Sequence, residues 1–155
     1  MLTRKLEPAD TQAASHLVRR GFEVYVAPEW EPQAATQFVK TDIGTPRMER
    51  LIRDSAFTAG TFGGSGELLG LIIMPKPTWL ALLFVDPDLF RLGIARALWQ
   101  QARQFVLTVT PPVESVDLNA STHAIGFYLK MGFVAGAIVE SKGRRGTRMV
   151  WRVNT

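Results

Sequence analysis

The chain has 155 residues, of which 46% are hydrophobic and 21% charged, and its formal net charge is +4. These values are ordinary for a single globular domain with a sizeable core, and they exclude an intrinsically disordered chain. The mild positive charge favours an anionic ligand, but it is not the concentrated basic stripe of a DNA-binding module, so we expect no nucleic-acid partner.

The lack of cysteine excludes disulfides, thiolate metal sites and a cysteine nucleophile, and with two histidines we expect no metal. No apolar run approaches the roughly 20 residues that a membrane helix needs. The N-terminal residues lack the apolar stretch of a signal peptide. We therefore expect one cytoplasmic domain, residues 1–155, that binds no membrane. Its oligomeric state stays open, a homodimer included.

The first predicted elements are an edge strand over residues 1–6 and a helix that begins at Glu7-Pro8. Proline in the first turn and acidic residues at the positive end are typical of a helix start. We expect this helix to reach Arg20 and to end at Gly21 as its C-cap. Further helices are expected over residues 33–41 and 45–53, the second with Thr45 as N-cap and Pro46 at the first helical position.

Between the first two helices, residues 22–30 are rich in aromatic side chains and are interrupted by Pro28, which predicts a loop or a bent helix. Two interpretations of Phe22, Tyr25 and Trp30 stay open. They form either a small satellite core under a loop or the wall of a substrate pocket, since ligand pockets are mostly apolar.

The middle of the chain predicts a hairpin and then a central strand. Gly63-Gly64-Ser65-Gly66 supplies the turn between strands over residues 57–62 and 67–74. Residues 79–85 carry no charge, which predicts a strand covered on both faces. Asp86-Pro87-Asp88 ends this strand, because proline cannot extend a ladder.

A loop with one glycine leads from this strand into the next helix, which is predicted from the apolar spacing of Ile94, Leu98, Ala102 and Phe105. Gly93 lies where the loop becomes the helix, and without a Cβ it lets a ligand approach the backbone. The free N–H groups and the macrodipole of a helix start bind phosphate well. Anion binding and simple packing remain alternatives for this glycine.

After the firm stop at Pro111-Pro112, the chain predicts a strand over residues 115–119 and a helix that begins near Ser121. A last hairpin, with strands over residues 133–140 and 147–153, has a basic turn between them. The cations of this turn are Lys142, Arg144 and Arg145. They are either a solvated hairpin tip or a charged rim for an anionic substrate or a nucleic acid.

Two motifs together resemble the GNAT superfamily of acyl-CoA-dependent N-acetyltransferases, in its bacterial small-molecule branch. The pyrophosphate loop of the family reads Gln/Arg-x-x-Gly-x-Gly/Ala, and the residues from Phe90 to Ala95 match it except at Phe90. The second signature is Ala-x-x-x-Tyr-x-x-x-Gly-Phe, which Ala124, Tyr128, Gly132 and Phe133 meet in full. The resemblance covers Leu68 to Arg152 well and the first 60 residues loosely.

The resemblance implies an α/β (α+β) fold with a mixed, mostly antiparallel sheet and helices on both faces. The strands that end at Val85 and Asn119 are then parallel and splay apart, and acetyl-CoA enters between them, as ligands do at the carboxyl ends of such strands. The implied contacts with acetyl-CoA are Leu83, Phe84, Val85, Phe90, Arg91, Leu92, Gly93, Ile94, Ala95, Arg96, Asn119, Ala124 and Tyr128.

The implied reaction is attack of a small molecule's neutral amine on the thioester, with Tyr128 as the general acid that protonates the departing thiol. The ordinary pKa values of a phenol and an alkyl thiol, ~10 and ~8.5, are close enough for proton transfer. A core tyrosine with a bonded hydroxyl is the alternative. The implied substrate contacts are Phe22, Tyr25, Trp30, Asn119 and Ser121, although the last two could also only cap the helix.

The general base stays unassigned, with Glu23, Glu29, Glu31 or a water as candidates. That gap motivates an alternative function, a non-catalytic acyl-CoA-binding sensor or partner-docking domain. Acetylation of a protein amine is a variant of the first hypothesis, and a nucleic-acid accessory protein is a weaker third one.

Overall fold

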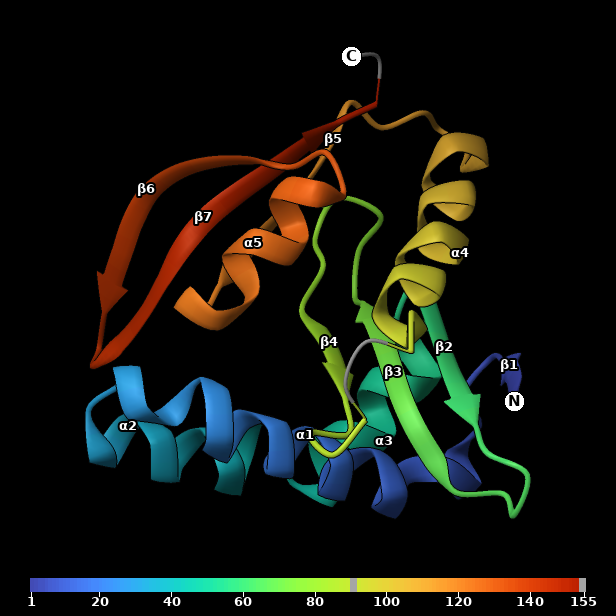
Figure 1. Ribbon diagram of the computed structural model, residues 1–155, viewed down its shortest axis with the longest axis horizontal. Helices are drawn as coiled ribbons and strands as arrows, with labels where there is room; N and C mark the ends of the chain where they lie inside the picture. The colour runs from blue at the N-terminus through green and yellow to red at the C-terminus, as the bar shows by residue number, and fades with distance from the viewer. Residues whose placement is uncertain (90–91, 154–155) are drawn as a thin grey trace.

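The computed structural model describes residues 1–89 and 92–153, and it shows a mixed α+β fold with two antiparallel sheets and helices around them (Figure 1). In chain order the elements are β1 (Leu2–Arg4), the 3-10 turn η1 (Pro8–Asp10), α1 (Thr11–Tyr25), the 3-10 turn η2 (Ala27–Glu29), α2 (Pro32–Gln37), the π-helical turn η3 (Phe38–Asp42), α3 (Thr45–Asp54), β2 (Phe57–Phe62), β3 (Leu68–Met74), β4 (Leu82–Val85), α4 (Ile94–Thr108), β5 (Ser115–Ala120), α5 (Thr122–Lys130), β6 (Val134–Ser141) and β7 (Arg144–Arg152).

The strands form a four-stranded sheet in the order β1-β2-β3-β4 and a three-stranded sheet in the order β5-β7-β6. Both predicted hairpins are present, β2 with β3 and β6 with β7. The last hairpin is longer than expected, because its turn consists of Lys142 and Gly143, both with positive φ (53° and 80°). Two such residues form the tight connection that suits twisted antiparallel strands.

The two sheets join at one point and then separate. Trp79 and Asp117 form a parallel bridge, Leu80 N donates to Asp117 O at 3.0 Å, and Asp117 N donates to Thr78 O at 2.9 Å. Beyond this bridge, and among the described residues, β4 pairs with β3 and β5 pairs with β7, but β4 and β5 do not pair with each other. The predicted splay of the two parallel strands is therefore confirmed, and Figure 1 shows the sheets leaning apart.

The predicted central strand over residues 79–85 is regular only from Leu82 to Val85. Its first part turns back on itself, since Trp79 N donates to Lys76 O at 3.1 Å and Trp79 also bridges to the other sheet. The segment before β4 thus serves to couple the two sheets, and the ladder with β3 begins after it.

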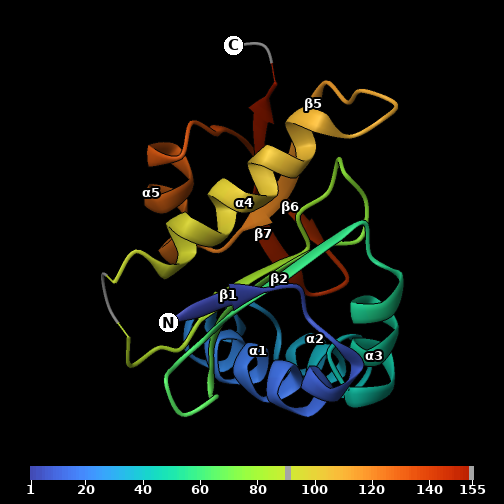
Figure 2. The same ribbon diagram turned by 90° about the vertical axis from the view of Figure 1, so that its right-hand side faces the viewer.

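Two hydrophobic clusters cover opposite faces of the first sheet. Side chains of β3 alternate between them: Leu71 and Ile73 face the cluster of α1 and α3, while Ile72 and Met74 face the cluster of α4. Figure 2 shows α4 on one side of these strands and α1 and α3 on the other. The sheet therefore separates the helix that follows the glycine loop from the helices of the N-terminal third.

Helix α1 continues through Gly21 to Tyr25, so the predicted C-cap at Gly21 is wrong. A Cβ at this position would lie 2.6 Å from Cδ1 of Phe84 in β4. The glycine therefore allows the helix to pack closely on the central strand. The helix goes on past it because Phe22, which is 1% exposed, joins the buried core.

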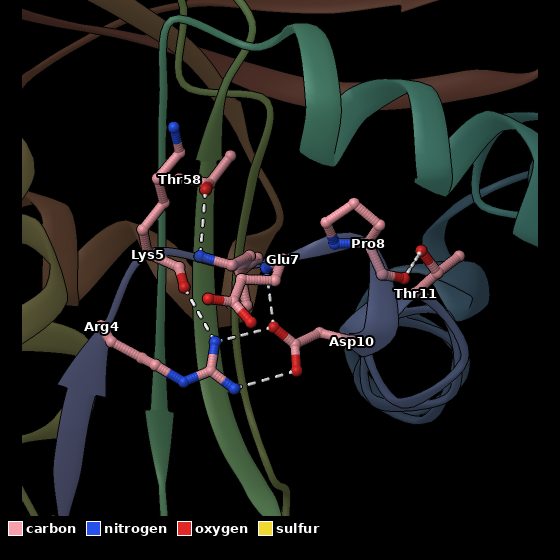
Figure 3. A network of polar contacts seen from close by, with 8 residues as sticks. Arg4, Lys5, Glu7, Pro8, Asp10, Thr11 and Thr58 are labelled. Carbon is pink, nitrogen blue, oxygen red and sulfur yellow. Dashed lines mark hydrogen bonds and ion pairs between the residues drawn. The ribbon is translucent and has the colours of Figure 1, made fainter.

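The start of α1 is fixed to the first sheet by a polar network (Figure 3). Arg4 of β1 donates to both carboxylate oxygens of Asp10 at 2.9 and 3.1 Å, and Glu7 N donates to Asp10 at 2.7 Å. The Arg4 guanidinium, together with the Glu7 N–H, holds the pKa of Asp10 below its ordinary value. Leu6 N reaches Thr58 of β2 at 3.3 Å, so the N-terminal segment is tied to two strands.

Helix boundaries differ slightly from the predicted ones. The expected helix over residues 33–41 is α2 continued by η3, and the expected first helix begins with the η1 turn. The N-cap of α3 is Gly44 and not Thr45, since Met48 N donates to Gly44 O at 2.9 Å. A Cβ at Gly44 would lie 2.6 Å from Lys40 O, which explains why a glycine stands there.

In the described part of the chain, no helix is long and apolar enough to cross a membrane.

Candidate active site

A cavity of about 1270 Å³ lies where the two sheets diverge. Its lining combines β4 and the segment after it, the β5–α5 junction, the aromatic region of α1 to η3, the start of α3, and the tip of the β6–β7 hairpin. Of the predicted site residues it contains Phe22, Tyr25, Trp30, Leu83, Phe84, Val85, Ala95, Asn119, Ser121, Ala124 and Tyr128. The structure thus brings most of the predicted site residues to one cavity. Of the predicted cofactor loop, Ala95 lines it, whereas Leu92, Gly93, Ile94 and Arg96 do not.

One wall of the cavity is the free edge of β4. Leu83 and Phe84 pair with Ile72 and Leu71 of β3 on their other side. Because β5 does not pair with β4, the backbone groups on this edge of β4 can form hydrogen bonds with an extended ligand, as they would with a further strand.

The start of α4 lies beside this edge. Gly93 is the N-cap residue with φ 73°, in the left-handed region that favours glycine, and a Cβ there would meet nothing within 4 Å. Buried Ile94 anchors the first turn, whereas Leu92 and Arg96 are exposed. Phe90 and Arg91, which belong to the predicted cofactor loop, lie outside the described residues. The open first turn presents free N–H groups to an anion.

The segment between β4 and this loop is fixed by Arg20, which was not among the predicted site residues. Arg20 of α1 donates to Asp86 at 3.0 Å and to Asp88 at 3.2 Å, and Asp88 N donates to Asp86 Oδ1 at 2.9 Å. The Asp88 N–H, and after it the Arg20 guanidinium, hold the pKa of Asp86 below its ordinary value. Asp86 thus stays charged and bound to Arg20 of α1 at neutral pH.

Tyr128 lies on α5 against Phe127 and Phe133, with ring centroids 5.2 and 5.3 Å away, and it is 6% exposed. It lines the cavity together with Ala124, one turn earlier on the helix. Its hydroxyl finds no hydrogen-bond partner within the described part of the chain. Burial raises the pKa of Tyr128 well above its ordinary value, so the phenol keeps its proton across the physiological range.

The two polar residues at the β5–α5 junction, Asn119 and Ser121, differ in their hydrogen bonds. Asn119 Oδ1 accepts from Arg148 Nε at 2.8 Å, and Arg148 also lies 3.5 Å from Asp117. Ser121 is the N-cap residue of α5, but its side chain makes no capping bond. That position leaves the Ser121 hydroxyl available to a ligand.

None of the three glutamates considered as a base lines the cavity. Glu29 accepts from the Thr122 backbone N at 2.8 Å and from the Thr122 hydroxyl, which ties η2 to the start of α5. Glu23 pairs with Arg19 at 2.7 Å on the exposed side of α1. Glu31 lies under the hairpin turn, where its backbone N donates to Gly143 O at 2.9 Å.

His123 does line the cavity, and its ring stacks on Tyr25 with centroids 3.9 Å apart and planes 10° from parallel. This histidine was not among the predicted site residues. Its place beside Ala124 of the second signature was the signal that it borders the site. Among the described residues, no group of three or more His, Cys, Asp or Glu side chains could hold a metal ion.

The aromatic wall of the cavity consists of Phe22, Trp30 and Phe38, with ring centroids 4.4 to 5.3 Å apart. Phe22 is buried, while Trp30 and Phe38 are partly exposed. The wall is thus both a small core and a cavity surface, and the two interpretations offered by the sequence are not exclusive. Tyr25 lies apart from it, stacked on His123.

The basic hairpin turn docks on this wall. Trp30 Nε1 donates to Arg145 O at 2.9 Å, Arg144 pairs with Asp42 at 2.9 Å, and the Arg144 guanidinium lies 5.2 Å from the Trp30 ring centre. The turn is therefore held on the aromatic wall through Arg144 and the Arg145 carbonyl, while the Lys142 and Arg145 side chains stay exposed, as a solvated tip would have them.

Comparison with known proteins identifies the family. The model of the acetyltransferase (GNAT) domain matches residues 26–153. The chain belongs to the GNAT acetyltransferase family. None of the curated proteins matches it in sequence.

Solved structures show the same fold for this GNAT acetyltransferase. It superposes on a GCN5-related N-acetyltransferase of Rhodopseudomonas palustris with a TM-score of 0.80 at 17% identity, covering 97% of this chain and 94% of that one. The PaiA N-acetyltransferase of Thermoplasma acidophilum, solved with coenzyme A, gives 0.77 at 17% identity, with coverage of 97% and 98%. A variant of the spermidine N-acetyltransferase SpeG of Vibrio cholerae gives 0.67 at 17% identity, with coverage of 98% and 93%.

Proposed function

We propose that this protein transfers the acetyl group of acetyl-CoA to a primary amine of a small molecule by direct attack. The observation that carries the proposal is the cavity between β4 and β5, which opens past the bridge of Trp79 and Asp117 and is bordered by the start of α4. Membership of the GNAT family and the coenzyme A bound to the Thermoplasma relative support acyl-CoA as the donor.

In this proposal the pantetheine arm extends along the free edge of β4 and its amides pair with Leu83, Phe84 and Val85. The pyrophosphate accepts hydrogen bonds from N–H groups of the first turn of α4, from Leu92 to Arg96, where the helix dipole also favours negative charge. Ala124 leaves room for the arm on the opposite side. The thioester then lies between the end of β4 and Tyr128, which line the same cavity.

The chemistry is acyl transfer by a neutral amine. The amine nitrogen attacks the thioester carbonyl carbon, the C–S bond breaks, and the nitrogen gives up one proton to water. Tyr128 donates its phenol proton, or a hydrogen bond, to the departing sulfur. The raised pKa of Tyr128 makes complete transfer to a thiolate unfavourable, since a thiol is the stronger acid by its ordinary pKa of ~8.5. Stabilisation of the developing negative charge by a hydrogen bond is therefore the larger part of its role.

No carboxylate serves as the base in this scheme. Glu23, Glu29 and Glu31 lie outside the cavity lining, so we assign the uptake of the amine proton to water. The proposal predicts a reaction that speeds up with pH as more of the amine becomes neutral.

The test is release of free thiol from acetyl-CoA across a panel of small amines. Turnover that depends on both substrates supports the proposal. Binding of coenzyme A without turnover of any amine would contradict it.

The second candidate is a non-catalytic acyl-CoA sensor. It is favoured because both carboxylates of the described cavity lining, Asp42 and Asp86, are already paired with arginines and neither is free to act as a base. The same assay separates the two functions. A sensor binds acetyl-CoA and leaves it intact with every amine, whereas the enzyme releases thiol with at least one.

A further inference from the structure

The far end of the cavity, away from the start of α4, is lined by basic side chains. Among the described lining residues, Arg47, Lys142, Arg144 and Arg145, here called the cationic rim, stand against two carboxylates, Asp42 and Asp86. Arg47 belongs to the first turn of α3, and the other three to the hairpin tip. The rim therefore consists of segments about a hundred residues apart in sequence.

The rim lies on the other side of the first sheet from the proposed phosphate site. Helix α3 packs on the face that bears Leu71 and Ile73, whereas α4 packs on the face that bears Ile72 and Met74 (Figure 2). The hairpin tip is held on that same N-terminal side by the contacts of Trp30 with Arg145 and of Asp42 with Arg144. These cations are thus placed to serve the acceptor, not the phosphates at the start of α4.

Both carboxylates of the lining are already engaged. Asp42 pairs with Arg144 at 2.9 Å, and Asp86 pairs with Arg20 at 3.0 Å. An acceptor with a second ammonium group, such as a polyamine, would meet four cations and no free carboxylate of the described lining. Like charges brought together in this way oppose binding.

Two members of the rim are available to a ligand. Arg145 has Glu140 at 3.3 Å, and Arg144 is held by Asp42 and by the rings of Trp30 and Phe38. Arg47 and Lys142 are exposed, and within the described part of the chain neither side chain forms an ion pair or hydrogen bond. A guanidinium and an ammonium without partners, next to partly exposed Trp30 and Phe38, match an anion attached to an apolar body.

We infer that the acceptor is an amine that also carries a carboxylate or similar anion on an apolar or aromatic body, with Arg47 and Lys142 binding the anion and Trp30 and Phe38 contacting the body. This inference rests on the proposed acetyl transfer, whose site it deepens. It differs from the basic substrate that the name of the Vibrio relative implies for that protein.

Matched pairs of amines test it. Thiol release is measured with 4-(aminomethyl)benzoate and benzylamine, and with 6-aminohexanoate and hexylamine, so that the members of each pair differ in a carboxylate held away from the amine. Spermidine is the polyamine. We expect the catalytic efficiency to be higher for the anionic member of each pair by roughly tenfold or more, and to be lowest for spermidine. The preference should shrink as salt is added, since the rim is exposed.

Variants assign the effect to the rim. Combining Arg47→Gln with Lys142→Gln should raise KM for the anionic amines by roughly tenfold while leaving KM for acetyl-CoA unchanged. Arg50→Gln is the matched control, because Arg50 is exposed on the same helix but does not line the cavity.

The inference is overturned, with acetyl transfer intact, if the amines without a carboxylate or spermidine react best, or if the double variant keeps the wild-type KM for the anionic amines. If coenzyme A binds and no amine of either kind releases thiol, the proposed function itself fails, and the inference fails with it.

Discussion

At the scale of single residues, Tyr128 is the group whose role the cavity defines most sharply. It is buried against Phe127 and Phe133, its hydroxyl has no partner among the described residues, and burial raises its pKa. Because Tyr128 lines the cavity, its hydroxyl is placed to donate a hydrogen bond to a ligand there.

Tyr128→Phe should therefore lower kcat by about 100- to 1,000-fold, the range for losing one hydrogen-bond donor to developing negative charge, with the affinity for coenzyme A changed little. Steady-state kinetics and calorimetry measure the two quantities. Tyr25→Phe is the comparison, because it removes the other phenol of the cavity lining, whose ring is stacked on His123, and should leave kcat much less affected. A Tyr128→Phe enzyme with wild-type kcat would remove the phenol from the mechanism.

The pH dependence of kcat follows from the same pKa. Since burial raises the pKa of Tyr128 above its ordinary value of ~10, the acid form persists throughout the range in which most enzymes are assayed. The rate should rise with pH as the amine loses its proton and should show no alkaline decline due to Tyr128 below about pH 10. A decline between pH 7 and 9 that disappears in Tyr128→Phe would show that the phenol ionises far more easily than its burial implies.

At the scale of elements, the contact between α1 and β4 sets the position of the central strand. Gly21 allows the approach, since a Cβ there would lie 2.6 Å from Phe84, and Phe84 lines the cavity. Arg20, the neighbouring residue, fixes the segment after β4 through Asp86 and Asp88. One turn of one helix thus holds both the strand and the approach to the glycine loop.

Gly21→Ala should lower the free energy of unfolding by about 1–3 kcal/mol, because crowding against Phe84 outweighs the better helix propensity of alanine. Gly126→Ala is the matched control: Gly126 is exposed in α5, and a Cβ there would meet nothing within 4 Å. It should raise stability by about 0.5–1 kcal/mol. Denaturant unfolding measures both. If Gly21→Ala and Gly126→Ala changed the free energy of unfolding equally and with the same sign, the close packing of α1 on β4 would be contradicted.

Arg20→Gln should loosen the segment that leads into α4 and weaken coenzyme A binding severalfold. The Arg20 side chain is about a third exposed and pairs with two aspartates. Arg19→Gln is the control, since Arg19 pairs with Glu23 on the exposed side of the same helix. Calorimetric titration with coenzyme A would contradict the positioning role if both variants bound like the wild type.

At the scale of the whole molecule, the sequence predicted the features that local patterns encode. Both hairpins, the helix at Gly93 and the helix at Ser121 follow from turn residues and apolar spacing, and the splay of β4 and β5 followed from the family resemblance. It did not predict that α1 passes Gly21, because only the nearby Phe84 explains that glycine. The docking of Arg144 on Asp42 and the pair of Arg20 with Asp86 join residues more than sixty positions apart, and no local pattern reports such contacts.

The site was predictable to the same extent. The signature residues Ala124 and Tyr128 and the β4 residues line one cavity with the aromatic region of α1 and η2. Two contacts were not predicted: the hydrogen bond from Thr122 to Glu29 and the stacking of His123 on Tyr25. Both depend on how the N-terminal third of the chain packs on α5, and the sequence of that third resembles the family only loosely.

Backbone hydrogen exchange with and without coenzyme A tests the central claim most directly, because the proposed ligand is held largely by main-chain groups. We predict that coenzyme A slows exchange of the amides of residues 83–85 and 92–97, while those of β1 and of the exposed strand β6 keep their rates. Saturating coenzyme A that leaves the amides of β4 and of the first turn of α4 unprotected would contradict the account.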